Sequence, residues 1–360
     1  MEIKLMKSMT LSELSKRTNL DEQIILDSNP NLTLSFIPEE QHLYLPDNCV
    51  LDWRGYSIIE PLQKETEIIK KVFDSQSLYK EITKLKESYP FIQTEIIGYS
   101  VLNKPIIEIR IGNGPKKIHM NGSFHANEWI TTSIMMYWLH HFLKGIVHDD
   151  IFQGASFIQM YKETTISFVP MVNPDGVDLV LNGLPHQVEY EAPLLQMNNL
   201  SIDFKDWKAN IRGIDLNNQY PVKWEIEKAR KLPKVPAPRD YPGDQPLSEP
   251  EAIFLAELVK ARNFDRVLAF HTQGEEIYWG YERKEPKEAE LIVKEFEKLS
   301  GYKAVRYIDS HAGFRDWFVH DFKKAGFTIE LGNGVNPLPF EQFEEIYEKS
   351  KGIFFASLYM

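Results

Sequence analysis

The sequence predicts an α/β fold, with a largely parallel or mixed sheet covered by helices on both faces. Apolar, β-rich segments alternate with long helical patterns along most of the chain, and polar residues directly follow several of the apolar segments. The expected strands are residues 94–99, 106–111, 117–120, 165–169, 266–270 and 327–331. The clearest helical patterns are residues 129–143 and 249–261.

Length, composition and charge narrow the class of protein. The 360 residues suffice for one large domain or two unequal ones, and a hydrophobic share of 43% with 12% aromatics is typical of a globular chain with a substantial core. The net charge of −11 opposes general binding to nucleic acid or to an anionic membrane surface. Cys49 is the only cysteine, so a disulfide within the chain and a thiolate-rich zinc site are both excluded.

The opening residues contain no apolar run of the length that a secretory signal needs, and about 18 consecutive apolar residues occur nowhere. We therefore expect a soluble protein made in the cytoplasm and no membrane span. Release to the cell wall or to a spore is left open.

Residues 1–48 have a pattern of their own, with two short helices expected at 11–20 and 21–32 and a short strand within 41–48. The segment resembles a LysM module, a small domain that binds cell-wall glycan. The matching residues are Leu11, Leu14, Ser15, Ile24, Ile25, Asn29, Pro30 and Leu43 to Pro46. The module's usual opening strand is not expected, since Met9 and Thr10 stand in its place. The alternative is a small appendage that only docks on the main domain at 49–360, reached through a linker with Pro61 and a charged helical segment at 64–88.

Three residues with metal-ligand chemistry follow expected strands. His125 and Glu128 lie three apart just after strand 117–120, and His271 lies just past strand 266–270. Ligands bind at the carboxyl ends of strands in open α/β sheets. Two histidines and one glutamate leave a fourth position for water, as catalytic zinc requires.

A carboxylate stands at a third strand end, where Glu330 is flanked by apolar neighbours. Beside a metal site it can take a proton from the attacking water and deliver it to the leaving amine. The aperiodic stretch 180–244, rich in Asn, Pro and charge, is longer than ordinary connections and is expected to form walls of a site.

In this order and context the motifs resemble the zinc carboxypeptidase family over residues 56–360. The matching segments are His125-Ala-Asn-Glu128-Trp129, Phe270-His271-Thr272, Phe327-Thr-Ile-Glu330-Leu331 and Asn173-Pro-Asp-Gly176. The resemblance implies a mixed eight-stranded sheet between helices. It also implies one zinc ion per chain, held by His125, Glu128 and His271, and Glu330 as the general base.

Residues 207–219 resemble the family segment that stabilises the oxyanion and clamps a substrate's terminal carboxylate. The resemblance implies Arg212 as the oxyanion-stabilising residue, with Lys208 as a second candidate for that role. Asn217 matches the asparagine of the clamp, but Asn218 stands where an arginine is expected. Ordinary recognition of a C-terminal residue is therefore in doubt.

Residues 307–317 resemble the region with the family's mobile tyrosine and the floor of its specificity pocket. Counting from Trp317 puts Arg315 at the floor, where a guanidinium calls for an anionic partner. The count reaches Ile308 where the tyrosine is expected, so the neighbouring Tyr307 is assigned that role.

The LysM-like start, the missing clamp arginine and the cationic pocket together resemble the γ-D-glutamyl-L-diamino acid endopeptidase branch of the family. This implies a metalloprotease that hydrolyses the γ-D-glutamyl to meso-diaminopimelate bond of peptidoglycan stem peptides, with Arg315 meeting a diaminopimelate carboxylate. The first alternative is a conventional carboxypeptidase that removes acidic C-terminal residues. The second is a non-catalytic protein that binds cell-wall glycan.

Overall fold

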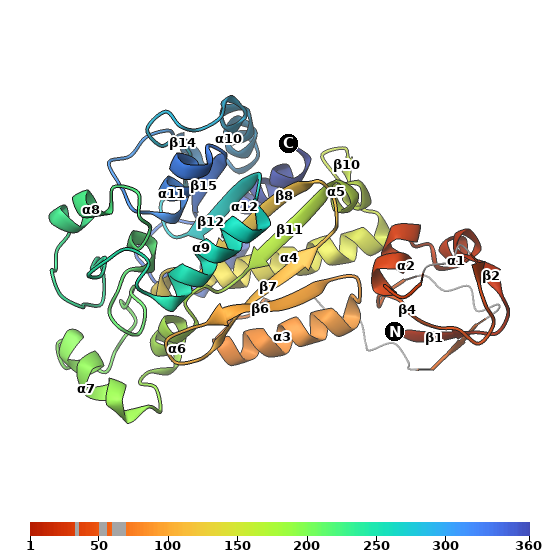
Figure 1. The fold of residues 1–360 in the computed structure, drawn as a ribbon, viewed down its shortest axis with the longest axis horizontal. Coiled ribbons are helices and arrows are strands. Elements are labelled where there is room, and N and C mark those ends of the chain that lie inside the picture. Colours follow the sequence, from red (N-terminus) through yellow and green to blue (C-terminus); the bar gives the residue numbers. More distant parts are fainter. Residues whose placement is uncertain (33–35, 50–55, 60–69) are drawn as a thin grey trace.

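The computed structural model describes residues 1–32, 36–49, 56–59 and 70–360 (Figure 1). Its centre is an eight-stranded sheet in the order β14-β13-β15-β12-β8-β11-β7-β6. The strands are β6 (Gln93–Tyr99), β7 (Pro105–Ile111), β8 (Lys116–Gly122), β11 (Thr164–Val169), β12 (Arg266–His271), β13 (Glu276–Tyr278), β14 (Lys303–Val305) and β15 (Ala325–Glu330). The expected mixed eight-stranded sheet is confirmed, and all six strands expected from the sequence are present.

The middle of the sheet is parallel and its flanks are mixed. Strands β11, β8, β12 and β15 run parallel to one another, whereas β7 joins β11, β6 joins β7 and β13 joins β15 in antiparallel pairs. The carboxyl ends of β8, β12 and β15 therefore meet at one edge of the sheet. The short strands β13 and β14 were not expected, because three residues are too few to show a period.

Alternate residues of β12 face two separate cores. Leu268 and Phe270 belong to the core on one face, and Val267 and Ala269 to the core on the other. The first face is covered by α4 (Ile130–His148), α5 (Phe157–Glu163), α10 (Lys287–Ser300) and α12 (Phe343–Tyr359). The second is covered by α9 (Pro250–Arg262) and α11 (Phe314–Phe322). Figure 1 shows α9 in front of the sheet and α4 behind it.

Helix α4 is apolar on nearly all sides because it is enclosed by other elements. Its Trp138 stacks on Phe142 and on Phe354 of α12, at ring-centroid distances of 5.1 and 5.0 Å. Each such aromatic buried from water contributes about 1.5–3 kcal/mol. This packing fixes the N-terminal end of α4, which follows the candidate metal ligand Glu128.

The expected helical segment 64–88 is shorter in the structure. Helix α3 runs from Ser75 to Ser88, and Asp74 begins it by accepting a hydrogen bond from the Ser77 amide at 2.8 Å. The start of the expected segment and the linker residue Pro61 lie outside the described residues.

The N-terminal unit contains a strand that the sequence did not lead us to expect. Strand β1 (Glu2–Leu5) pairs antiparallel with β4 (His42–Tyr44) and with β5 (Tyr56–Ile58), so the prediction of no opening strand was wrong. Ile3 and Leu5 are buried, but two apolar positions are too short an alternation to identify a strand. Because β5 belongs to this sheet, the small unit extends beyond the boundary expected at residue 48.

The two expected helices of this unit are α1 (Leu11–Thr18) and α2 (Glu22–Ser28), and the remaining strands β2 (Met9–Thr10) and β3 (Phe36–Ile37) pair with each other. Both ends of α2 contact the main domain, where Tyr161 donates to Asp27 and Lys162 pairs with Asp21, the N-cap residue.

Most of the stretch 180–244 is irregular, as expected. Its regular pieces are the end of α6 (Pro174–Asn182), then α7 (Val188–Met197), the 3-10 turn η2 (Leu216–Asn218) and α8 (Trp224–Arg230). The other short elements are β9 (Ile151–Phe152), β10 (Ala155–Ser156), η1 (Ala126–Glu128) and η3 (Phe340–Gln342). Among the described residues, no helix combines the length and the apolar character needed to span a membrane.

Candidate metal centre and active-site cavity

The candidate metal ligands are brought together by the ends of β8 and β12. Gly122, the last residue of β8, pairs with Phe270, and His271 ends β12. The chain leaves β8 through Ser123, whose φ of 49° turns it toward η1, and the Thr131 hydroxyl accepts from the Ser123 amide at 2.9 Å. This turn places His125 beside His271.

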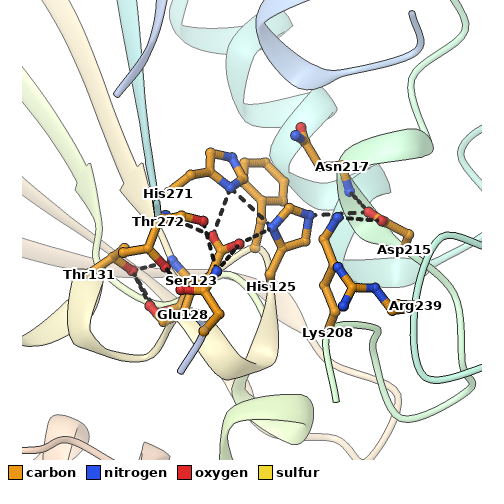
Figure 2. Close-up of polar contacts among 12 residues, drawn as sticks. Ser123, His125, Glu128, Thr131, Lys208, Asp215, Asn217, Arg239, His271 and Thr272 are labelled. Carbon is orange, nitrogen blue, oxygen red and sulfur yellow. Dashed lines mark hydrogen bonds and ion pairs between the residues drawn. The ribbon is translucent and has the colours of Figure 1, made fainter. Parts of the chain in front are cut away.

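The side chains of His125, Glu128 and His271 converge on one point and are all buried (Figure 2). The Nδ1 atoms of the two histidines are 3.2 Å apart. Glu128 Oε1 lies 2.8 Å from the first of them, and Oε2 lies 3.0 Å from the second. One ion bonded to each ligand at about 2.0–2.2 Å, as zinc is, fits this spacing and this set of two nitrogens and one carboxylate.

Hydrogen bonds hold the carboxylate of Glu128 in place. The amide of Thr272 donates to Oε2 at 3.2 Å, and Asn336 Nδ2 lies 3.4 Å from Oε1. Burial opposes ionisation, but the neighbouring imidazoles of His125 and His271 outweigh it and lower the pKa of Glu128. The carboxylate of Glu128 is therefore charged although it is buried, as a candidate metal ligand requires.

Asp215 connects His125 to a partly buried lysine, Lys208. Its Oδ1 lies 3.2 Å from His125 Nε2, and its Oδ2 lies 3.1 Å from Lys208 Nζ (Figure 2). Burial favours the neutral acid, but Lys208 and His125, with a smaller contribution from Lys231, hold the pKa of Asp215 well below its usual range. A carboxylate on the far nitrogen of a ligating histidine orients the ring toward the metal.

Glu330 lies beside the ligands because of strand register. It is the last residue of β15 and pairs with His271 in the parallel ladder between β12 and β15. Burial, followed by the charge of Glu128, raises its pKa to about 8. A carboxyl group whose pKa lies near neutrality both accepts and releases a proton readily.

A cavity of about 170 Å³ opens at this centre and is lined by most of the residues that the sequence predicted for the site. From the sequence-predicted set it is lined by His125, His271, Glu330, Asn217, Asn218, Arg315 and Lys208. Lys231 and Tyr278 also line it and were missed. Lys231 follows α8 within the aperiodic stretch and Tyr278 ends a three-residue strand, so neither belongs to a pattern that sequence reasoning could use.

The structure does not bring Arg212 to this cavity. Its side chain is 47% exposed, lies 3.5 Å from Glu249, and lines a different cavity of about 760 Å³ between α7 and residues 235–237. This geometry does not support Arg212 as the oxyanion-stabilising residue, and of the two candidates only Lys208 lines the cavity. The backbone explains the difference, because the Ala126 amide donates to the Lys208 carbonyl and so joins Lys208 to the loop of His125.

Tyr307 is not at the cavity either. It is 45% exposed and donates its hydroxyl to Glu285 at 2.8 Å, whereas its neighbour Ile308 lines the cavity. The assignment of Tyr307 to the mobile tyrosine is thus not supported by this geometry. Counting back from Trp317 had given Ile308 as the position of the tyrosine, and Ile308 is the residue that lines the cavity.

Arg315 is buried at the cavity, as expected for a pocket floor. Its Nη1 donates to the Gly280 carbonyl at 2.8 Å and its Nη2 lies 2.6 Å from Asp316, while its Nε has no hydrogen-bond partner among the described residues. Asn217 is held by its Oδ1, which accepts from the Phe314 amide at 3.1 Å. The cavity thus offers guanidinium, ammonium and amide groups.

Comparisons with known proteins identify the family of the chain. The zinc carboxypeptidase profile matches residues 78–351, and the chain belongs to this family. Gamma-D-glutamyl-L-diamino acid endopeptidase 1 of Lysinibacillus sphaericus is 51% identical over 80% of this chain and 72% of its own length. An uncharacterized protein of Bacillus subtilis strain 168, YqgT, is 43% identical over 97% of this chain and 96% of its own.

The fold is shared with solved carboxypeptidases. A carboxypeptidase A from Helicoverpa armigera superposes with a TM-score of 0.60 at 17% identity, covering 80% of this chain and 73% of that one. The family and the fold expected from the sequence are confirmed. The likeness of the N-terminal unit to LysM stays a prediction.

Proposed function

We propose that this protein is a zinc endopeptidase that hydrolyses the bond between γ-D-glutamate and meso-diaminopimelate in peptidoglycan stem peptides. The observation that carries the proposal is a cavity that joins the His125, Glu128 and His271 centre and Glu330 to the cationic groups of Lys208, Lys231 and Arg315. Stem peptides with this bond carry several free carboxylates. The relative from L. sphaericus, named for this activity, supports the choice.

The chain's residues supply most of the chemistry. Zinc held by His125, Glu128 and His271 would polarise the scissile carbonyl and acidify water. Glu330 takes the proton of the attacking water and passes it to the leaving amine. Lys208, paired with Asp215 inside the protein, presents an ammonium group to the developing oxyanion.

Arg315 gives the proposed specificity on the leaving side. Its guanidinium contacts Gly280 and Asp316 and lines the cavity, where a carboxylate of diaminopimelate would pair with its charge. Full activity of Arg315→Ala on a stem-peptide substrate would contradict this placement.

The test is incubation of the purified protein with L-Ala-γ-D-Glu-meso-diaminopimelate, with products separated by chromatography. Release of diaminopimelate is expected, a chelator should abolish it, and Glu330→Gln should lower its rate by about 10²–10⁴. A peptide with an ordinary α-linked acidic C-terminus serves as the second substrate. Cleavage of that peptide alone would assign the protein to the conventional carboxypeptidases.

We further propose that the N-terminal unit binds cell-wall glycan. The order β1, α1, α2 and β4, with β1 and β4 paired antiparallel, supports the LysM resemblance. Glu330→Gln protein should be retained on insoluble peptidoglycan and released by N-acetylglucosamine oligomers. Release by free stem peptide alone would contradict glycan binding.

A further inference from the structure

Lys231 is a cation at the cavity whose donors are not used. It follows the last turn of α8, its side chain is 28% exposed, and it lines the same cavity as His125 and Glu330. Its Nζ lies 3.7 Å from Glu227 Oε1 and 3.7 Å from Asp240 Oδ1. Both distances exceed a hydrogen bond, so within the described chain the ammonium group has charged neighbours but no acceptor.

Those neighbours have closer partners. Arg230 Nη2 lies 2.7 Å from Glu227 Oε2, which also accepts from the His311 amide, and Arg239 Nε lies 3.1 Å from Asp240 Oδ2. Lys231 is therefore not needed to neutralise either carboxylate. An ion pair that only fixes α8 to the following loop would be expected at shorter distances.

Lys231 stands on the Lys208 side of the cavity. Both ammonium groups approach the same oxygen, Asp240 Oδ1, at 3.6 Å for Lys208 and 3.7 Å for Lys231. Arg315 instead belongs to α11, and its guanidinium contacts Gly280 and Asp316. The cavity thus has two separate cationic positions besides the candidate oxyanion group.

A γ-glutamyl bond differs from an ordinary peptide bond by one charge on its acyl side. The D-glutamyl residue is linked through its side chain, so its α-carboxylate is free, and side-chain methylenes separate it from the scissile carbonyl. In an α-linked peptide the main chain has no carboxylate there. A cation beside the oxyanion group can pair with this carboxylate and so distinguishes a γ-glutamyl substrate from an α-linked peptide.

We propose that Lys231 binds the free α-carboxylate of the γ-linked D-glutamyl residue and so selects γ-glutamyl substrates. The inference rests on the proposed endopeptidase function and adds to it the recognition of the acyl side. Arg315 binds a carboxylate on the leaving side, so the two cations bind carboxylates on opposite sides of the scissile bond.

The test compares two substrates that differ in a single group. One is L-Ala-γ-D-Glu-meso-diaminopimelate, and the other carries a neutral carboxamide in place of the D-glutamyl α-carboxylate. Wild-type protein should prefer the carboxylate by roughly tenfold or more in kcat/KM, since hydrogen bonds to charged groups discriminate on that scale. Lys231→Met should bring this ratio close to one, chiefly by losing activity on the carboxylate substrate, and Lys231→Arg should keep the preference.

The matched control is Arg239→Met, which removes a cation from the same Asp240 but does not line the cavity. Its ratio should equal that of the wild type. An unchanged ratio in Lys231→Met, or an equal loss in Arg239→Met, would overturn the role of Lys231 while leaving the endopeptidase function standing. No cleavage of either substrate by the wild type would overturn the proposed function and this role together.

Discussion

Replacing Lys208 by methionine tests which cation stabilises the oxyanion. The Lys208 ammonium lies 3.1 Å from Asp215 on the wall of the cavity, and its side chain is only 17% exposed. Loss of one preorganised donor to an oxyanion lowers kcat by about 10²–10³. We expect a fall of this size in diaminopimelate release by Lys208→Met. Arg212→Met changes a side chain that is 47% exposed, so its kcat should stay within about twofold of the wild-type value.

The variant must be shown to fold. Methionine removes the ammonium partner of Asp215, and an uncompensated buried charge costs about 3–5 kcal/mol of stability. The contact of Asp215 with His125 remains and should limit this cost. Thermal unfolding and metal content therefore accompany the kinetics, and Lys208→Arg provides a variant that keeps the charge. A folded, metal-loaded Lys208→Met with wild-type kcat, or a large loss in Arg212→Met, would refute the reasoning.

Three further outcomes are expected. In the proposed mechanism Glu330 carries the proton and is not a metal ligand, so Glu330→Gln should lower kcat by about 10²–10⁴ while metal content by mass spectrometry stays unchanged. Zinc should raise the melting temperature of the wild-type protein and leave His271→Ala unaffected in differential scanning calorimetry, because an ion that binds only the folded state stabilises it. Burial, with the charge of Asp175, raises the pKa of Glu251 to about 8. The stabilising contribution of Glu251 is thus complete below 4.5, its pKa in the unfolded chain, and is lost as the pH rises through 8. The free energy of unfolding measured in urea should therefore depend less on pH between 5 and 8 for Glu251→Gln than for the wild type.

The metal centre could be predicted from the sequence because its residues lie at the end of an apolar strand or in the turn that follows one. His271 and Glu330 are each the last residue of a six-residue strand. Parallel strands bring their carboxyl ends to one edge of the sheet regardless of the conformation of the connecting loops. Strand periodicity is a local property of the sequence, and together with the resemblance of the motifs to a known family it was enough to predict the site.

The walls of the cavity could not be predicted in the same way. Lys208 and Arg212 both lie in an aperiodic segment, and the choice between them depends on a long-range backbone bond between Ala126 and Lys208. Lys231 reaches the cavity through a loop with no regular spacing. Strand β1 was missed for another reason, since its partners β4 and β5 are distant in the sequence and its own pattern is short.

The pairing of His271 with Glu330 in one ladder has a consequence for how such an enzyme can change. Glu330, the proposed base, and His271, a candidate metal ligand, lie on adjacent strands of one sheet, so their separation does not depend on the chain between residues 180 and 244. Insertions, deletions or exchanged charges in that region can alter which peptide is admitted without rebuilding the reaction centre. The reaction centre and the residues that select the substrate are therefore separable, and new specificities can arise through changes in the loops while the sheet stays the same.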